Sequence, residues 1–492
     1  MLTILATLLI FASGHQPFDD PKPYSPNDTV LFALHDLQSM DAVSQKNARY
    51  LSLANIPAAK RARFTQVLDF VLNSLSRRQS MVFCTPVPGS NGCVVRVMLS
   101  EYRQGPNGWE TLASKGSGPV RVAAKTDAPD PYYTINLGEL TRRVHKRDKD
   151  GDLLYWDGDT SRPVYEEARP GGLTPGTWFD ITAYSAVQSL TGSSFPILRA
   201  DWFIANASLN PGYSEMLGIK TLADFQKLVR FRAEDNDLSG RAVVADSQLV
   251  SLHQRGIEFT PKVQGTYWQT YDFLKGSGVN DLLKDPLSRK RDAGEVFAEL
   301  PNGLQAFALV DGKDKIIDVA DGNIVADQVT PWKNKLVWNG LYSCTNCHRN
   351  GAADILDEVR PLTSPPRALL SKKQPEFLEF VDKYSKSIEA ELAGTRARYA
   401  VAVSAATRGL KPEENTTAYG QVFIEYQQKP LTINEAAAET GCTPAQLTAI
   451  LGRIIEPDPA VTTLLAGRPL RRDLWEAAYP LVATAVYKEI KK

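Results

Sequence analysis

The chain has few of the residues that most often bind metals or form disulfides. Its 492 residues include only five histidines, five cysteines and five methionines. It also lacks an excess of charge, since 56 lysines and arginines balance 56 aspartates and glutamates. The protein as a whole therefore has no strong positive electrostatic field that would attract nucleic acid or an anionic membrane. We expect the function to depend on a localised site, with no nucleic-acid partner.

Long apolar runs are absent after the first residues. Residues 1–14 form an apolar run that is too short to span a bilayer as a helix and that ends in small residues. This pattern predicts a signal peptide, and hence a periplasmic or secreted protein. No later stretch approaches about 18 consecutive apolar residues, so we expect no membrane span after cleavage.

A Cys-x-x-Cys-His motif stands at Cys344, Cys347 and His348. In an exported chain this spacing is typical of covalent c-type haem attachment. Residues three and four apart share one face of a helix, so all three side chains can point at one ligand. The two thiols would form thioethers with the haem vinyl groups, and the imidazole of His348 would bind iron from the proximal side. The sequence therefore predicts one covalent haem c.

Two other interpretations of the motif remain open. It could be half of a zinc site, but zinc needs two further ligands, and the sequence has no second CxxC or HxxxH to supply them. It could also be two surface cysteines beside an unrelated histidine.

Elsewhere, Cys84 and Cys93 flank a turn-rich segment between two apolar runs, which predicts a hairpin closed by a disulfide in an oxidising compartment. The alternative is two half-buried cysteines that merely face each other.

The sixth iron ligand decides between kinds of haem chemistry. The last methionine, Met216, precedes the motif, which excludes the common methionine ligand downstream of it. Besides His15 and the motif, the chain offers His35, His145 and His253. His253 comes just before an aromatic cluster at residues 267–273, so it is our candidate for the distal ligand. An open site, or a tyrosine or lysine ligand, is the alternative.

Hydrophobic periodicity predicts an α+β protein. Residues 15–125 combine helices with a small sheet, and residues 126–330 form a β-rich mixed region with hairpins. The strongest hairpin signal joins strands at 296–300 and 304–310 through Pro301, Asn302 and Gly303. Residues 331–492 contain the haem motif and then long helical patterns. One of these helices is expected to run from about Phe377 to near Gly409.

Several segments together resemble a family of large, exported, single-haem cytochrome c-like proteins of environmental bacteria. The similar segments are Phe195–Phe203, Tyr267–Phe273, Leu300–Phe307, Asn434–Gly441 and the haem motif. The resemblance implies a monohaem cytochrome of the bacterial envelope. The chain departs from the family at 289–295, where an acidic, histidine-containing lead-in is expected, so no role for such a histidine carries over.

Three functions follow as hypotheses, and they leave open whether the chain is an enzyme. The first is electron transfer to a redox partner protein. The second is a haem peroxidase or a gas-reactive haem enzyme with an open distal site, in which Arg199 or another polar group would stabilise a bound oxygen ligand. The third is a binding or structural module that the covalent haem stabilises by crosslinking the chain. The length of the chain favours the second or third, because simple electron carriers need far fewer residues.

Overall fold

The protein is described here by a computed structural model. The described residues are 26–54, 56–103, 106–115, 143–145, 165–167, 181–232, 240–244, 253–274, 282, 285, 287–320, 337–355, 357, 379–380, 384, 388–428, 430–440, 442–454, 458–471, 474–475, 478, 481–482 and 485. They form a mixed α+β fold with two main sheets, which confirms the predicted class. The predicted signal peptide lies outside the described residues. Among the helices described, none is long and apolar enough to cross a membrane.

The larger sheet is antiparallel and has the strand order β11-β10-β9-β8-β7. Its strands are β7 (Gly240–Val244), β8 (His253–Pro261), β9 (Thr266–Leu274), β10 (Ala293–Glu299) and β11 (Gln305–Asp311). The predicted hairpin is confirmed, with Glu299 opposite Gln305 at its last pair. Gly303 has a φ of 86°, a left-handed conformation that glycine adopts without a steric penalty.

The smaller sheet has the order β2-β3-β1-β6, with β1 parallel to β6 and antiparallel to β3. Its strands are β1 (Ala48–Ser52), β2 (Thr85–Pro86), β3 (Val94–Met98) and β6 (Ile197–Arg199). Two further strand pairs are β4 (Arg143–His145) with β5 (Tyr165–Glu167), and β12 (Val319–Ala320) with β13 (Val337–Trp338). Three strands of the smaller sheet come from the first hundred residues, and the fourth, β6, comes from a later part of the chain.

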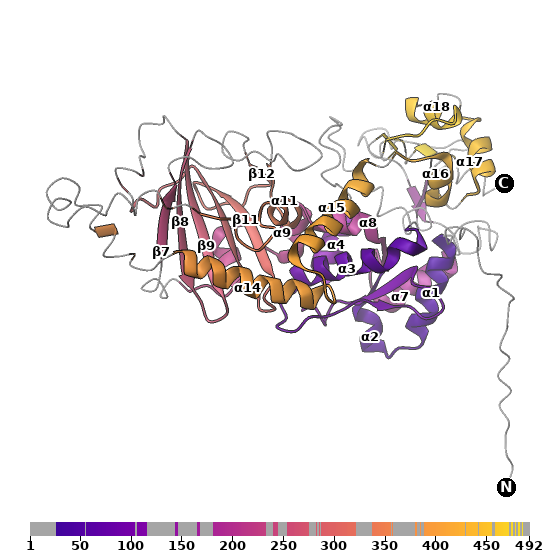
Figure 1. Ribbon diagram of the computed structural model, residues 1–492. Coiled ribbons are helices and arrows are strands. Elements are labelled where there is room, and N and C mark those ends of the chain that lie inside the picture. Colours follow the sequence, from indigo (N-terminus) through magenta and orange to yellow (C-terminus); the bar gives the residue numbers. More distant parts are fainter. Residues whose placement is uncertain are drawn as a thin grey trace, which may run out of the picture.

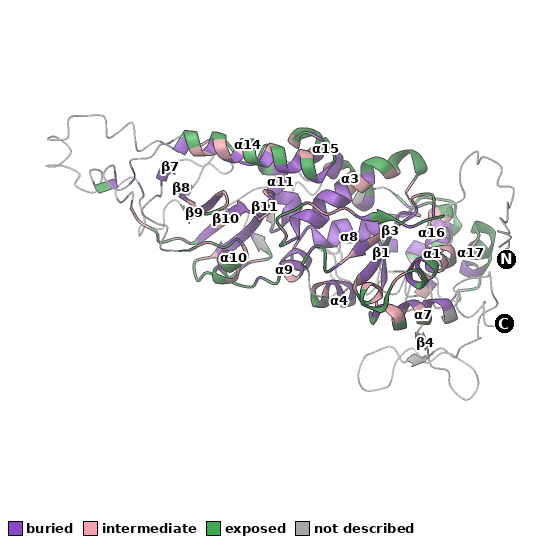
Figure 2. Ribbon diagram, turned by 90° about the horizontal axis from the view of Figure 1, so that it is seen from below, coloured by how far each residue is buried: buried purple, intermediate pink, exposed green. Residues whose placement is uncertain are grey.

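The helices of the first half contact both sheets. They are α1 (Pro26–Gln38), α2 (Ala42–Asn47), α3 (Ala58–Ser74), α4 (Pro106–Lys115), α7 (Ile181–Thr191), α8 (Ala200–Ala207), α9 (Gly212–Leu217) and α10 (Leu222–Leu228). In α3 the side chains of Phe64, Val67, Leu68 and Val71 recur at helical spacing and are all buried. Every residue of α8 is buried, so this helix lies inside the molecule, as Figure 2 shows.

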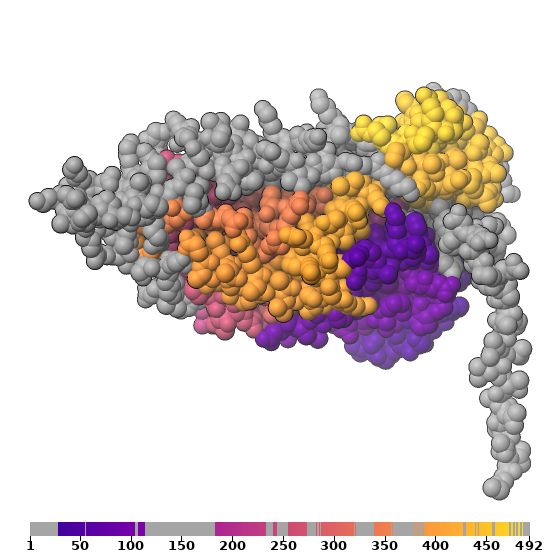
Figure 3. All heavy atoms as spheres, in the orientation of Figure 1, coloured from indigo at the N-terminus to yellow at the C-terminus, as the bar shows by residue number. Residues whose placement is uncertain are grey.

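The second half adds α11 (Leu341–Cys347), α14 (Ile388–Ala406), α15 (Pro412–Gln428), α16 (Ile433–Thr440), α17 (Pro444–Leu451) and α18 (Pro459–Leu465). Helix α14 runs along the larger sheet, and α16 to α18 gather at the far end of the molecule (Figure 1). Figure 3 shows α14 and α15 covering much of one face. Helix α14 ends close to Gly409, as predicted, but the described helix begins at Ile388, and most of residues 377–387 lie outside the described part.

The predicted disulfide finds no suitable geometry. The hairpin exists, its first strand is Thr85–Pro86, and Thr85 pairs with Arg96. Extending this register places Cys84 opposite Val97, four residues from Cys93, which is roughly 13 Å along a strand. A disulfide spans Cα atoms no more than ~7 Å apart. Both cysteines are free and buried, and burial raises the pKa of the Cys93 thiol to about 11.

Candidate functional site

Four aromatic side chains form a row across the larger sheet. They are Phe259, Trp268, Phe297 and Phe307, one from each of β8 to β11, and each is the register partner of the next. Their ring centroids are 5.3, 5.6 and 6.0 Å apart along the row. All four are buried. Because side chains alternate between the faces of a strand, the four rings lie on one face of the sheet, where the row forms an apolar floor.

The haem motif sits on this floor. Helix α11 contains Cys344 and Cys347, and His348 directly follows it, with its backbone N–H donating to the carbonyl of Cys344 at 2.7 Å. The imidazole of His348 lies 4.9 Å from the ring of Phe297 and 5.6 Å from that of Phe307, measured between centroids. The prediction that the motif occupies a helical turn is therefore confirmed at its backbone.

A glycine fixes where α11 begins. Gly340 precedes the helix with a φ of 142°. A Cβ at this position would lie only 2.4 Å from the carbonyl oxygen of Ser208, at the end of α8. The next residue but one, Tyr342, donates its backbone N–H to the same carbonyl at 3.1 Å. Only glycine allows this close approach, which positions α11 between α8 and the sheet.

A buried carboxylate faces the motif histidine. Oε1 of Glu295, in β10, lies 3.1 Å from Nε2 of His348. Glu295 and Phe297 are two residues apart on one strand and so share a face of the sheet. Burial would raise the pKa of Glu295, but the charge and hydrogen bond of His348, together with the charge of Arg255, outweigh it and hold this pKa below its usual value. The carboxylate is therefore ionised beside the imidazole.

A second buried ion pair supports this carboxylate. Arg255 in β8 donates from Nε and Nη2 to the two carboxylate oxygens of Asp272 in β9, at 2.6 and 3.2 Å. Burial alone would lower the pKa of Arg255, but the charges of Asp272, Glu295 and Cys347 raise it above its usual value. The arginine thus stays charged. It balances two acids close to the motif in a region with little water to screen them.

The three motif side chains differ in exposure. Cys344 is buried and Cys347 is exposed. The His348 ring is largely buried, and its Nδ1 has no hydrogen-bond partner among the described residues. A buried polar atom without a partner is costly and uncommon in folded proteins. Nε2 of His348 is therefore engaged by Glu295, whereas Nδ1 is available for a further hydrogen bond.

The donor set fits a haem c. Two cysteine side chains and an imidazole stand on one turn with the spacing that covalent attachment needs. The aromatic floor provides the apolar wall that such a group requires. One feature of the arrangement must change, because Glu295 occupies the Nε2 atom with which His348 would bind iron. Haem binding therefore requires Glu295 to give up this contact.

The other predicted ligands are placed as follows. His253 is the first residue of β8 and pairs with Leu274, two residues before Arg255, but its side chain lies outside the described part. His35 is exposed on α1. His145 is in β4, again with its side chain outside the described part. The candidate distal ligand therefore stays a prediction.

Arg199 is bound by two carboxylates. Its Nη2 lies 2.6 Å from Oδ2 of Asp201, and its Nη1 lies 2.6 Å from Oε1 of Glu439 in α16. All three side chains are buried. Glu439 also accepts from Nε1 of Trp475 at 2.7 Å. This cluster ties α16 to the smaller sheet, so we assign Arg199 a structural role in place of the one expected with a bound oxygen ligand.

Sequence reasoning missed the residues that surround His348. Asp272 was visible only as part of an aromatic cluster, and Glu295 only as the end of a basic stretch. No local signal marks either of them, because their register across β8 to β10 brings them together.

For the zinc alternative, no group of three or more His, Cys, Asp or Glu able to hold a metal occurs in the described parts of the chain.

Comparisons with family models, with curated proteins and with solved structures found no match to this chain. The resemblance to single-haem cytochrome c-like proteins therefore stays a prediction, and the functional argument depends on the site itself.

Proposed function

We propose that this chain is an exported, bacterial c-type haem protein that transfers single electrons to a redox partner in the cell envelope. The observation that carries the proposal is the Cys-x-x-Cys-His turn, whose imidazole is buried against Phe297 and Phe307. A covalently held haem would supply a one-electron redox centre there. The apolar floor supports the proposal, because a redox group shielded from water reorganises its surroundings little when its charge changes.

The roles of the chain's own residues follow from their chemistry. Cys344 and Cys347 would hold the haem through thioether bonds, each formed by addition of S–H across a vinyl double bond, which would consume no oxidant or reductant. His348 would bind iron through Nε2, and Glu295 would have to leave that atom. Phe297 and Phe307 exclude water from the side of the imidazole that they contact.

The decisive experiment is maturation of the full chain in a periplasm, followed by a pyridine haemochrome spectrum and an intact mass. We expect one haem per chain that resists acidic acetone extraction. Cys344→Ala combined with Cys347→Ala should abolish that covalent haem, whereas Cys442→Ala, which removes a cysteine outside the motif, should keep it. A mature chain with no haem increment would refute the proposal, as would covalent haem in the double variant.

Low-temperature electron paramagnetic resonance then separates the hypotheses about the sixth ligand. A low-spin bis-histidine signal that disappears in His253→Ala would identify this residue as the distal ligand. The same signal surviving the substitution would exclude it. A high-spin ferric signal that shifts with added cyanide would favour a peroxidase or gas-reactive enzyme over electron transfer.

A further inference from the structure

A basic pocket lies away from the haem motif, between the end of α3, the turn before α4 and the end of α10. It has a volume of about 380 Å³. Its charged lining residues are Arg77, Arg103, Asp224, Lys227 and Arg230. Four positive charges therefore face one negative charge, in a chain whose total charge is zero. Such a local excess in a concave surface attracts anions.

Within the described ranges no ion pair joins these four cations to a carboxylate, although the charge of Lys227 acts on Asp224. The acid in the pocket is already engaged. Asp224 accepts hydrogen bonds from the backbone N–H groups of Lys220 and Thr221, both at 3.0 Å, and from the Thr221 hydroxyl at 2.9 Å. It thereby caps the start of α10. The Lys220 backbone hydrogen bond is the largest cause that lowers the pKa of Asp224.

The backbone holds these arginines in unusual conformations. Arg103 and Arg230 have φ values of 52° and 56°, in the left-handed region that residues with side chains rarely adopt. Such conformations persist where the surrounding structure imposes them, and they cluster at functional sites. Arg77 is anchored as well, since its Nη2 donates to the carbonyl of Leu217 at 2.6 Å. The guanidinium of Arg77 is thus held in place by a hydrogen bond.

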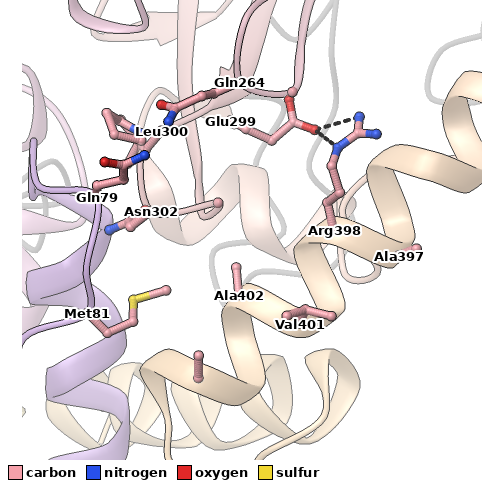
Figure 4. Close-up of a pocket in the computed structure, with 14 residues that line it drawn as sticks. Gln79, Met81, Gln264, Glu299, Leu300, Asn302, Ala397, Arg398, Val401 and Ala402 are labelled. Atoms are coloured by element: carbon pink, nitrogen blue, oxygen red, sulfur yellow. Dashed lines mark hydrogen bonds and ion pairs between the residues drawn. The ribbon is translucent and has the colours of Figure 1, made fainter.

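An apolar hollow lies next to this pocket, between α14 and the β10–β11 turn (Figure 4). Its volume is about 700 Å³, within the range of pockets that bind small molecules. Apolar side chains line much of it, among them Met81, Leu300, Val401 and Ala402. At its edge, the charges of Glu299 and Arg398 cancel in an ion pair at 3.0 Å. The hollow therefore suits an apolar group better than a charged one.

Two connections join the two hollows. Pro301 lines both of them. Arg77 of the basic pocket is two residues from Gln79 of the apolar hollow. The two hollows therefore lie on either side of the same short segments of chain.

We propose that the two hollows form one site for an amphipathic anion, with a phosphate or carboxylate head group in the basic pocket and an apolar chain in the hollow beside α14. The arginines and Lys227 supply the charge that the head group needs. Met81, Leu300 and Val401 supply the apolar contact. The site does not involve the haem motif, so it is independent of the proposed electron transfer.

Calorimetric titration of the full chain tests this site with three probes: inorganic phosphate, decyl phosphate below its micelle concentration, and neutral decyl glucoside. Decyl phosphate should bind at least about tenfold more tightly than either of the others, because burial of a few methylene groups and the charge contacts both contribute. Equal binding of decyl phosphate and phosphate would overturn the shared site. Equal binding of decyl phosphate and decyl glucoside would remove the role of the cations, and no binding by any probe would overturn the proposal entirely.

Variants test the two halves separately. Arg77→Gln with Lys227→Gln should weaken decyl phosphate binding about tenfold through the loss of charge-assisted hydrogen bonds. Lys220→Gln, which removes a neighbouring charge that does not line the pocket, should leave it unchanged. Ala405→Trp should fill the apolar hollow and reduce decyl phosphate to the affinity of inorganic phosphate. Wild-type affinity in the charge variant or in Ala405→Trp, with circular dichroism showing an intact fold, would contradict the site.

Discussion

Nε2 of His348 lies 3.1 Å from Oε1 of Glu295, although the two residues are 53 positions apart in the chain. The contact joins the end of α11 to β10 and makes the motif histidine part of a buried charge network with Arg255 and Asp272. It also engages the nitrogen that haem iron needs. The same residue thus takes part in the packing of the protein without cofactor and in the proposed site.

Glu295 should not be needed for haem attachment. Glu295→Gln keeps the size of the side chain but removes its charge, so we expect covalent haem at the wild-type level, since His348 leaves Glu295 when it binds iron. The pyridine haemochrome ratio of haem to protein measures this. Phe297→Ala is the comparison, because it should lower the haem content by removing one wall. A loss of haem in Glu295→Gln alone would show that the carboxylate takes part in attachment.

The Arg255 and Asp272 pair should show strong coupling. Arg255→Met leaves the Asp272 carboxylate buried without its partner, which we expect to cost about 3–5 kcal/mol of unfolding free energy. The double change of Arg255→Met with Asp272→Leu should recover most of that loss, since two apolar groups replace the pair. Urea denaturation of the two single variants and the double variant gives the coupling energy. Additive losses would mean that the two side chains act independently.

Asp69 should make the protein less stable as the pH rises. Its pKa is raised from 3.8 to about 6 chiefly by burial, with the Cys84 backbone hydrogen bond and the charge of Arg408 opposing the shift. The unfolded chain ionises Asp69 first, so its contribution is fully present below pH 3.8 and is lost as the pH rises through 6. Relative to wild type, the unfolding free energy of Asp69→Asn should rise by about 2–3 kcal/mol as the pH increases from 4 to 7.

The control for this prediction is an aspartate with the opposite shift. Asp41 is an exposed cap of α2, and hydrogen bonds from Ser44 lower its pKa. Asp41→Asn should therefore lose stability relative to wild type as the pH rises from 3 to 5. Thermal unfolding at a series of pH values, analysed for both variants, gives the two slopes. A flat difference for Asp69→Asn would contradict the raised pKa.

The aromatic row should be a major source of stability. Phe297 contacts Trp268, Phe307 and His348. We expect Phe297→Ala to lower the unfolding free energy by about 3–5 kcal/mol, through lost burial and the cavity left behind. Val263, which is 98% exposed in the turn between β8 and β9, is the matched control, and Val263→Ala should change little. A small loss of unfolding free energy for Phe297→Ala would mean that the neighbouring aromatic side chains move to fill the cavity.

Local chemistry explains which features could be predicted. The β10–β11 hairpin follows from alternating apolar residues around Pro301, Asn302 and Gly303, because a tight turn fixes the register of its two strands. The turn of helix that carries Cys344 and Cys347 likewise follows from spacing alone. The Cys84 and Cys93 hairpin shows the limit. The hairpin follows from the sequence. Its register does not, because pairing of Thr85 with Arg96 moves Cys84 along its strand, away from Cys93.

The sequence by itself determined the α+β class, the hairpin and the three motif residues, because each of these depends on residues close together in the chain. Only the tertiary structure decided that His348 meets Glu295, that Arg255 and Asp272 balance it, and that Arg199 is held by Asp201 and Glu439. These contacts depend on strand register and helix packing between distant segments. Burial then strengthens them, because charges interact far more strongly where water is excluded.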